Sequence, residues 1–244
     1  MAAPKDIIYG KKPVLEALER GQALEKILVA NSALRAEFHA LAKQHRTPIQ
    51  VVPPAKLDRI TRKNHQGVVA HLGFVDYQRV DAVVAQAYER GEAPLLIALD
   101  SITDVGNMGA IARSAWAMGA HALIVPEKGS ALINGITVKA SAGAIQQINI
   151  CKVSSLKQSL AELQEQGICL IATTLSDSAK PIQNIDFNQP CCIIMGNEEK
   201  GVGSNILAMS NEQAYIPMAR NFDSLNVSVA TGIMLYEVLR SKAD

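Results

Sequence analysis

The sequence predicts an α/β fold in two parts: a small N-terminal α/β unit and a larger unit built around a mostly parallel sheet. The first observation is an alternation of short apolar strand-like segments with amphipathic helical segments along the chain. The second is a set of nearly continuous apolar runs in the second half, such as residues 95–99, typical of strands buried on both faces. The third is size, since 244 residues with 48% hydrophobic and 19% charged side chains can bury a sizeable core.

The N-terminal unit is expected to span residues 1–75. Residues 10–13 form a turn that precedes a helix, and Ser32 is expected to cap a second helix that carries Leu34 and Phe38 on its apolar face. Strands are predicted at residues 26–30, 49–52 and 67–72, and a short helix at 57–61. This alternation predicts a small three-layer α/β domain.

Residues 76–93 are predicted to form a linker and an entry helix, and residues 94–244 the larger unit. Its strands are expected at residues 95–99, 122–126, 148–151, 168–172 and 191–195, with helices between them. Five or six parallel strands joined by crossover helices make a doubly wound sheet.

Charge is distributed unevenly between the two parts. Residues 1–75 hold 12 lysines and arginines against 6 carboxylates, whereas residues 76–244 hold 12 against 17. A basic first third would attract polyanions such as nucleic acid. A solvated charged face that binds nothing explains the same count equally well.

The sequence also indicates where the protein works. It has no apolar run near 18 residues and no apolar N-terminal stretch of the secretory type. The four cysteines lack metal-ligand spacing, and they are best interpreted as reduced core thiols. We therefore expect a cytoplasmic protein without a metal site and without a membrane partner.

Ligands of doubly wound sheets bind beyond the carboxyl ends of the strands, which selects the residues after Leu99, Ala172, Met195 and Ile216. A nicotinamide-nucleotide site is disfavoured, because the turn around Gly106 has no third glycine at the required spacing. The phosphate-binding G-x-x-x-x-G-K-[ST] pattern and a Ser-His-Asp set are also missing.

Three polar motifs lie at or beside those strand ends. The first is N-x-G-x-x-x-R, and the second is an apolar strand followed by G-x-E-x-x-G. The third is an I-P strand end followed by S-L-N-V-S-x-A. The residues that match are Asn107, Gly109 and Arg113, then Gly196, Glu198 and Gly201, then Ile216, Pro217, Ser224, Leu225, Asn226, Val227, Ser228 and Ala230. Together these motifs resemble those of the SpoU (TrmH-like) family of RNA ribose 2′-O-methyltransferases, over nearly the whole chain.

The resemblance implies a fold and a reaction. It implies an N-terminal RNA-binding domain similar to ribosomal protein L30e, supported by Ile8-Tyr9-Gly10 and His65-Gln66-Gly67. It also implies a SPOUT methyltransferase domain with a C-terminal trefoil knot, S-adenosyl-L-methionine as cofactor, and a homodimer through the last helix, roughly residues 227–240. The most similar members methylate a guanosine of 23S ribosomal RNA, so that RNA, and not DNA, is the expected partner.

Carried over position by position, the resemblance implies a catalytic set of Asn107, Arg113, Glu198, Ser224 and Asn226. Its cofactor contacts are Thr173, Gly196, Ile216, Leu225 and Asn226. Arg113 fits two roles, a clamp on the phosphate beside the reacting ribose or the base that removes its proton, and the clamp agrees better with a protonated guanidinium.

Plain structural explanations compete at some of these positions. Asn107 and Ser224 could cap the helices that follow them, and Glu198 could be an exposed turn acid. Asn226 has no such explanation at the level of sequence.

Three rival functions remain open. A tRNA ribose methyltransferase shares all the catalytic residues. A non-catalytic RNA-binding protein would keep the basic unit and bind no cofactor. A nicotinamide oxidoreductase fits least well.

Overall fold

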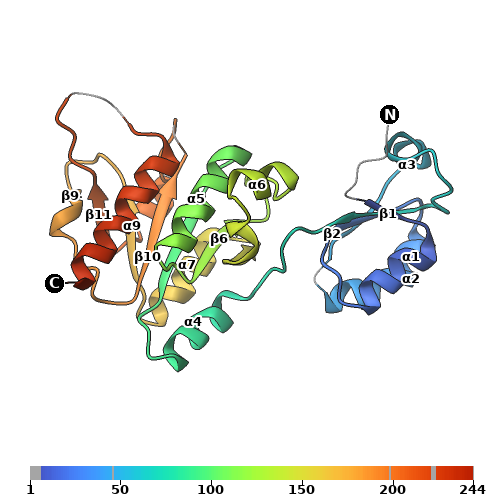
Figure 1. Cartoon of the computed structure of the whole chain (residues 1–244), viewed down its shortest axis with the longest axis horizontal. Coiled ribbons are helices and arrows are strands. Elements are labelled where there is room, and N and C mark those ends of the chain that lie inside the picture. Colours follow the sequence, from blue (N-terminus) through green and yellow to red (C-terminus); the bar gives the residue numbers. More distant parts are fainter. Residues whose placement is uncertain (1–6, 46, 198, 221–223, 244) are drawn as a thin grey trace. The chain divides into compact units, whose positions relative to one another are not determined.

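The computed structural model describes residues 7–45, 47–197, 199–220 and 224–243. The chain divides into two compact units, Met1–Asp76 and Tyr77–Asp244, which are described separately (Figure 1).

The small unit holds a four-stranded mixed sheet with the strand order β1-β4-β2-β3. Strand β4 runs antiparallel to β1 and β2, and β2 runs parallel to β3. The elements are β1 (Ile7–Tyr9), α1 (Lys11–Glu19), β2 (Leu24–Val29), α2 (Ser32–Gln44), β3 (Ile49–Val51), α3 (Pro54–Ile60) and β4 (Val68–Leu72).

Each face of this sheet has its own apolar core. Helices α1 and α2 pack on one face, where Leu18 and Phe38 are fully buried, and α3 packs on the other face through Leu57. The predicted three-layer α/β arrangement is therefore confirmed. The cap of α2 was predicted wrongly, because Asn31, and not Ser32, accepts the hydrogen bond from the Leu34 N–H (2.9 Å).

The large unit is built on a seven-stranded sheet with the order β7-β6-β5-β10-β8-β11-β9, in which neighbouring strands are parallel. Its strands are β5 (Leu95–Asp100), β6 (Ala122–Pro126), β7 (Asn149–Val153), β8 (Cys169–Thr173), β9 (Lys180–Pro181), β10 (Cys191–Gly196) and β11 (Glu212–Tyr215). Its helices are α4 (Val80–Glu89), α5 (Val105–Ala117), α6 (Gly135–Ala140), α7 (Leu156–Glu165), α8 (Ser204–Leu207) and α9 (Val227–Ala243), with 3-10 turns η1 (Ala144–Gln146) and η2 (Ile182–Asn184).

Helices cover both faces of this sheet. One face buries side chains of α4, α7 and α8, among them Val84, Leu160 and Ile206. Helices α5 and α9 pack side by side in front of β10 and β6 (Figure 1). The predicted doubly wound α/β sheet is confirmed, although it has seven strands, and not the five or six expected.

Residues 77–93, expected to contain a linker, are packed onto the large unit. Tyr77 forms a parallel bridge with Ile150, and Val83, Val84 and Ala87 of α4 are buried. In the described part of the chain, no helix is long and apolar enough to cross a membrane. The trefoil knot stays a prediction, since strand order alone does not establish how the chain threads.

Candidate functional site

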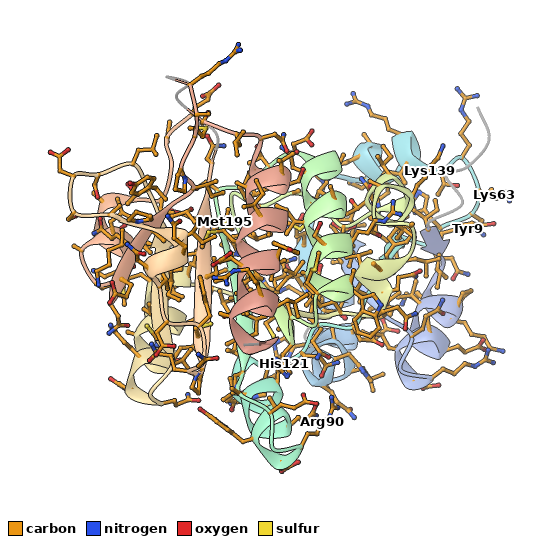
Figure 2. The ribbon with its side chains drawn as sticks, turned by 60° about the vertical axis from the view of Figure 1, so that its left-hand side comes forward. Tyr9, Lys63, Arg90, His121, Lys139 and Met195 are labelled. Carbon is orange, nitrogen blue, oxygen red and sulfur yellow. The ribbon has the colours of Figure 1, made fainter. Side chains whose placement is uncertain are left out.

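A cavity of about 360 Å³ opens beyond the carboxyl ends of three neighbouring strands, β10, β8 and β11. This volume lies in the range of small-molecule sites. The lining residues come from the three strand ends and from the segment that leads into α9: Thr173, Thr174, Leu175, Met195, Gly196, Asn197, Glu199, Gly201, Ala214, Tyr215, Ile216, Met218, Ser224, Leu225, Val227, Ala230 and Met234. Figure 2 shows Met195 near the end of β10 beside α9.

Four of the predicted cofactor contacts, Thr173, Gly196, Ile216 and Leu225, line this cavity. Ile216 lies just past the last paired residues of β11, so its backbone groups are outside the ladder of the sheet. The Thr173 hydroxyl donates to the Ile194 carbonyl (3.0 Å), which leaves its oxygen able to accept a hydrogen bond from a ligand. Backbone groups and apolar side chains thus dominate the wall.

Gly196 is required by a close backbone approach. A Cβ atom at this position would lie 2.1 Å from the Gly201 carbonyl carbon and 2.2 Å from the Val202 nitrogen. The turn after β10 therefore folds directly back over the strand end, where it forms one edge of the cavity.

Two polar side chains hold this turn. Asn197 donates from Nδ2 to the Ser101 carbonyl (3.1 Å), and its Oδ1 accepts from the Glu199 N–H (2.9 Å). The Asp100 carboxylate accepts from the Gly203 N–H (2.8 Å). The Asp100 carboxylate and the Ser101 carbonyl thus hold the turn in place, although neither residue lines the cavity.

The first and third motifs meet through one hydrogen bond. Asn226 donates from Nδ2 to Asn107 Oδ1 (3.0 Å), across 119 positions of sequence. Asn107 lies within α5, and the cap of that helix is Asp104, whose side chain accepts from the Asn107 N–H (2.7 Å). The capping role considered for Asn107 is therefore wrong.

Asn226 itself has a structural role that the sequence did not indicate. It directly precedes α9, and its Oδ1 accepts from the Ser228 N–H (3.0 Å), as the N-cap of a helix does. The cap considered for Ser224 is thus supplied by Asn226, and Ser224 lines the cavity instead.

Arg113 lies on α5 with an exposed side chain, which forms no hydrogen bond or ion pair with the residues that the structure describes. Its guanidinium is therefore available to an external anion.

Gly109, one turn earlier, packs tightly against α6, because a Cβ there would lie 2.5 Å from the Ala140 Cβ. Glu198 lies outside the described residues.

Several lining residues were not among the predicted cofactor contacts, for example Tyr215, Met218, Met234 and Glu199. Met218 and Glu199 do lie in the stretches that the sequence selected after Ile216 and Met195, whereas Tyr215 and Met234 do not. Tyr215 and Met218 flank the Ile-Pro pair of the third motif, so their nearness in sequence to a predicted contact was a usable signal. Met234 was not recognisable, because it lies two turns into an apolar helix.

The cavity fits S-adenosylmethionine by the chemistry of its wall. Apolar side chains such as Ile216, Leu225 and Met195 suit a purine ring, and hydroxyl and backbone groups at the strand ends suit the ribose and amino-acid parts. Among the described residues, no group of three or more His, Cys, Asp or Glu side chains is placed to hold a metal ion.

Two lysines of the small unit, Lys11 and Lys63, lie close to β1 and the loop before β4. Lys63 lies over the Tyr9 ring, 5.5 Å from its centroid (Figure 2). The Lys11 N–H donates to Gln66 Oε1 (3.2 Å), which joins the start of α1 to the loop before β4. Gln66 has a φ of +50°, so this loop holds a backbone conformation that is uncommon for a side-chain-bearing residue.

Comparison with known proteins agrees with these motifs. The SpoU rRNA methylase family matches residues 94–236, and the RNA 2′-O ribose methyltransferase substrate-binding domain matches residues 7–78. YacO of Bacillus subtilis, assigned to the TrmH family of tRNA/rRNA methyltransferases, is 34% identical over 245 residues, covering 99% of this chain and 98% of its own.

Solved structures are similar over nearly the whole chain. An rRNA methyltransferase from Sinorhizobium meliloti with bound AdoMet is 27% identical, with a TM-score of 0.61 over 96% of this chain and 87% of its own. The SpoU methyltransferase AviRb from Streptomyces viridochromogenes, also with AdoMet, is 26% identical, with a TM-score of 0.63 over 97% and 90%. The chain therefore belongs to the SpoU methylase family, and it is an S-adenosylmethionine-dependent RNA methyltransferase with the SPOUT fold.

Proposed function

We propose that this enzyme methylates the ribose 2′-hydroxyl of a guanosine in 23S ribosomal RNA, in the cytoplasm. The observation that carries the proposed site is the hydrogen bond between Asn226 and Asn107. It joins the helix of Arg113 to the segment whose residues Ser224 and Leu225 line the cavity. The polar motifs, far apart in sequence, thus converge beside one ligand-sized space.

In this proposal Thr173, Gly196, Ile216 and Leu225, which line the cavity, hold the cofactor, which supplies an electrophilic methyl group. Asn226, next to Leu225 but not among the lining residues, adds a further contact to it. Asn107 and Asn226 keep α5 and the start of α9 in register, and Ser224 and Glu198 position the nucleotide. Arg113 clamps the phosphate next to the reacting ribose, which is favoured by its exposed guanidinium, free of ion pairs with the described residues.

The small unit would hold the RNA. Its support is the match of residues 7–78 to a substrate-binding domain, together with the excess of lysine and arginine in residues 1–75. The choice of ribosomal RNA is supported by the likeness to the rRNA methyltransferase of Sinorhizobium meliloti along nearly the whole chain.

A tRNA ribose is the second candidate. The tRNA-modifying TrmH/SpoU enzyme of A. aeolicus is 30% identical with a TM-score of 0.58, but the match covers only 66% of this chain. The likeness along nearly the whole chain to an rRNA enzyme favours ribosomal RNA over tRNA.

We also propose a homodimer through α9. Val229, Tyr236 and Leu239 are 51%, 60% and 42% exposed, and Trp116 on the neighbouring helix α5 is 49% exposed. Leu235, on the same helix, is fully buried and belongs to the core. Large apolar side chains left in water on two packed helices suit a second copy.

Mapping 2′-O-methyl marks in ribosomal RNA and tRNA from cells with and without the protein tests the substrate. The proposal expects one guanosine mark in 23S RNA to disappear and to return when purified enzyme and S-adenosylmethionine are added. Loss of a tRNA mark alone would favour the second candidate. Unchanged marks, with no heat of S-adenosylmethionine binding in calorimetry, would favour a non-catalytic RNA-binding protein.

A further inference from the structure

Among the described residues that line the cavity, Glu199 has the only charged side chain. The rest of the described wall is apolar, amide, hydroxyl or backbone. A carboxylate at the edge of such a cavity makes the electrostatic potential there more negative.

The backbone around Glu199 is held in place, although the side chain is exposed. Its N–H donates to Asn197 Oδ1 (2.9 Å), and the Asn197 side chain is anchored on the Ser101 carbonyl (3.1 Å). The Gly201 N–H closes the turn on the Asn197 carbonyl (2.7 Å). Glu199 therefore stands on a backbone that is fixed beside the cavity.

The donor and the product of methyl transfer differ in charge. S-adenosylmethionine carries a sulfonium in addition to its ammonium and carboxylate, whereas S-adenosylhomocysteine has a neutral thioether and otherwise the same groups. A carboxylate at the cavity attracts the extra positive charge of the donor and gains nothing equivalent from the product.

We propose that Glu199 is a specificity-determining residue that makes the cavity prefer the charged methyl donor over the neutral product. The inference rests on the proposed cofactor site. Its consequence is weaker product inhibition, because the carboxylate retains the donor more strongly than the spent cofactor.

The test is calorimetric titration of the whole enzyme with S-adenosylmethionine and with S-adenosylhomocysteine. For Glu199→Gln we expect the Kd of the donor to rise about fivefold, as for the loss of one partly exposed charge pair, and the Kd of the product to change less than about twofold. Glu165→Gln is the matched control, because it removes the same charge from an exposed position at the end of α7, among residues that do not line the cavity.

Salt provides a second readout. The preference is the ratio of the Kd of the product to the Kd of the donor. Raising the ionic strength should lower this ratio for the wild type and leave it nearly constant for Glu199→Gln, because salt screens only the charge interaction. Retained product binding by the variant shows that the cavity is intact.

Equal changes in both affinities, or no change in either, would overturn the role of Glu199 while leaving the cofactor site standing. A wild-type protein that binds neither ligand would overturn the proposed site and this inference together.

Discussion

The amide of Asn226 serves two neighbours at once. Its oxygen accepts the Ser228 N–H at the start of α9, and its nitrogen donates to Asn107 on α5. One residue thus starts a helix and ties it to the helix that carries Arg113. The combination explains why an asparagine fits at this position, since serine and aspartate can cap but cannot also donate from an amide.

Substitution of Asn226 can separate these two roles. Asn226→Asp keeps a good N-cap but replaces the donor with a carboxylate facing Asn107 Oδ1, so we expect near-native stability and methyl transfer reduced at least about tenfold. Asn226→Ala should lose both roles and destabilise the fold by about 1 kcal/mol. Thermal melting and transfer of a labelled methyl group to RNA measure the two effects. Full activity in Asn226→Asp would show that the link to Asn107 has no catalytic importance.

Arg113 is predicted to act on RNA and not on the fold. Because its side chain is exposed, Arg113→Ala should melt like the wild type and transfer methyl groups about 100-fold more slowly or worse. Arg113→Lys should recover only part of that loss, because an ammonium cannot make the two parallel hydrogen bonds of a guanidinium to phosphate.

Arg90 offers the matched control for Arg113. It is an exposed arginine at the end of α4, labelled in Figure 2 well away from Met195 in the same unit. Arg90→Ala should leave turnover unchanged, and an equal loss in both variants would point to a general effect of surface charge.

At the scale of elements, helix α5 depends on a close approach to α6. A Cβ on Gly109 would lie 2.5 Å from the Ala140 Cβ and 2.9 Å from the Thr137 carbonyl oxygen, so one helix must move if a side chain is added. Gly109 is thus a packing residue within the first motif.

We expect Gly109→Ala to lower the free energy of unfolding by about 1–3 kcal/mol, in spite of the better helix propensity of alanine, because overpacking outweighs that gain. Gly119→Ala is not a fair control, because Gly119 has a positive φ, whereas Gly232 within α9 would place a Cβ no nearer than 3.8 Å to its closest neighbour, the Ser114 Oγ. Urea unfolding of Gly109→Ala and Gly232→Ala checks the prediction, which fails if the two variants are equally stable.

Elements with strong apolar patterns are predictable from the sequence, and elements without them are not. Strand β5 follows from a run of apolar residues that packs on both faces of the sheet. Strand β9 is the two residues Lys180–Pro181, too short for any periodicity, and β11 begins with the polar pair Glu212 and Gln213. The sequence analysis expected a strand end at Ile216, which agrees with the end of β11 at Tyr215, but it contained no counterpart of β9.

The candidate site likewise contains residues that the sequence indicates and contacts that only the folded chain creates. The motif residues were identifiable because they match a family pattern and because polar side chains follow strand ends at Gly196 and Ile216. The pairing of Asn226 with Asn107 could not be identified from the sequence, because the two residues are 119 positions apart and meet only when α5 and α9 pack together. The anchoring of Asn197 on Ser101 depends likewise on β10 lying beside β5.

At the scale of the whole molecule, the proposed dimer leads to a test of assembly. Val229→Glu combined with Tyr236→Glu should convert a dimer to a monomer in sedimentation velocity, because burying two carboxylates in an apolar interface costs several kcal/mol. Leu132→Glu, a change at a residue 58% exposed in the loop before α6, should leave the assembly intact. A wild-type protein that sediments as a monomer at all concentrations would contradict the proposed dimer.

The buried thiols make the stability of the large unit sensitive to alkaline pH. Burial raises the pKa of Cys151 and of Cys191 from 9.0 to about 12, and burial raises the pKa of Cys192 as well. In the unfolded chain these thiols ionise near pH 9, whereas in the folded protein they keep their protons. The unfolded state therefore binds fewer protons above pH 9, and the stability that the neutral thiols provide below that pH is lost as the pH rises toward 12.

Each buried thiol should lower the free energy of unfolding by ~1.4 kcal/mol per pH unit in that window. Urea titrations at several pH values from 8 to about 10.5 measure the slope. Cys192→Ala should be less stable than the wild type at pH 8 because of the lost packing, yet its stability should fall less steeply with pH, by the share of one thiol. All other titratable groups are common to both proteins, so the difference in slope isolates Cys192. Identical slopes would mean that this thiol ionises as readily in the folded sheet as in the unfolded chain.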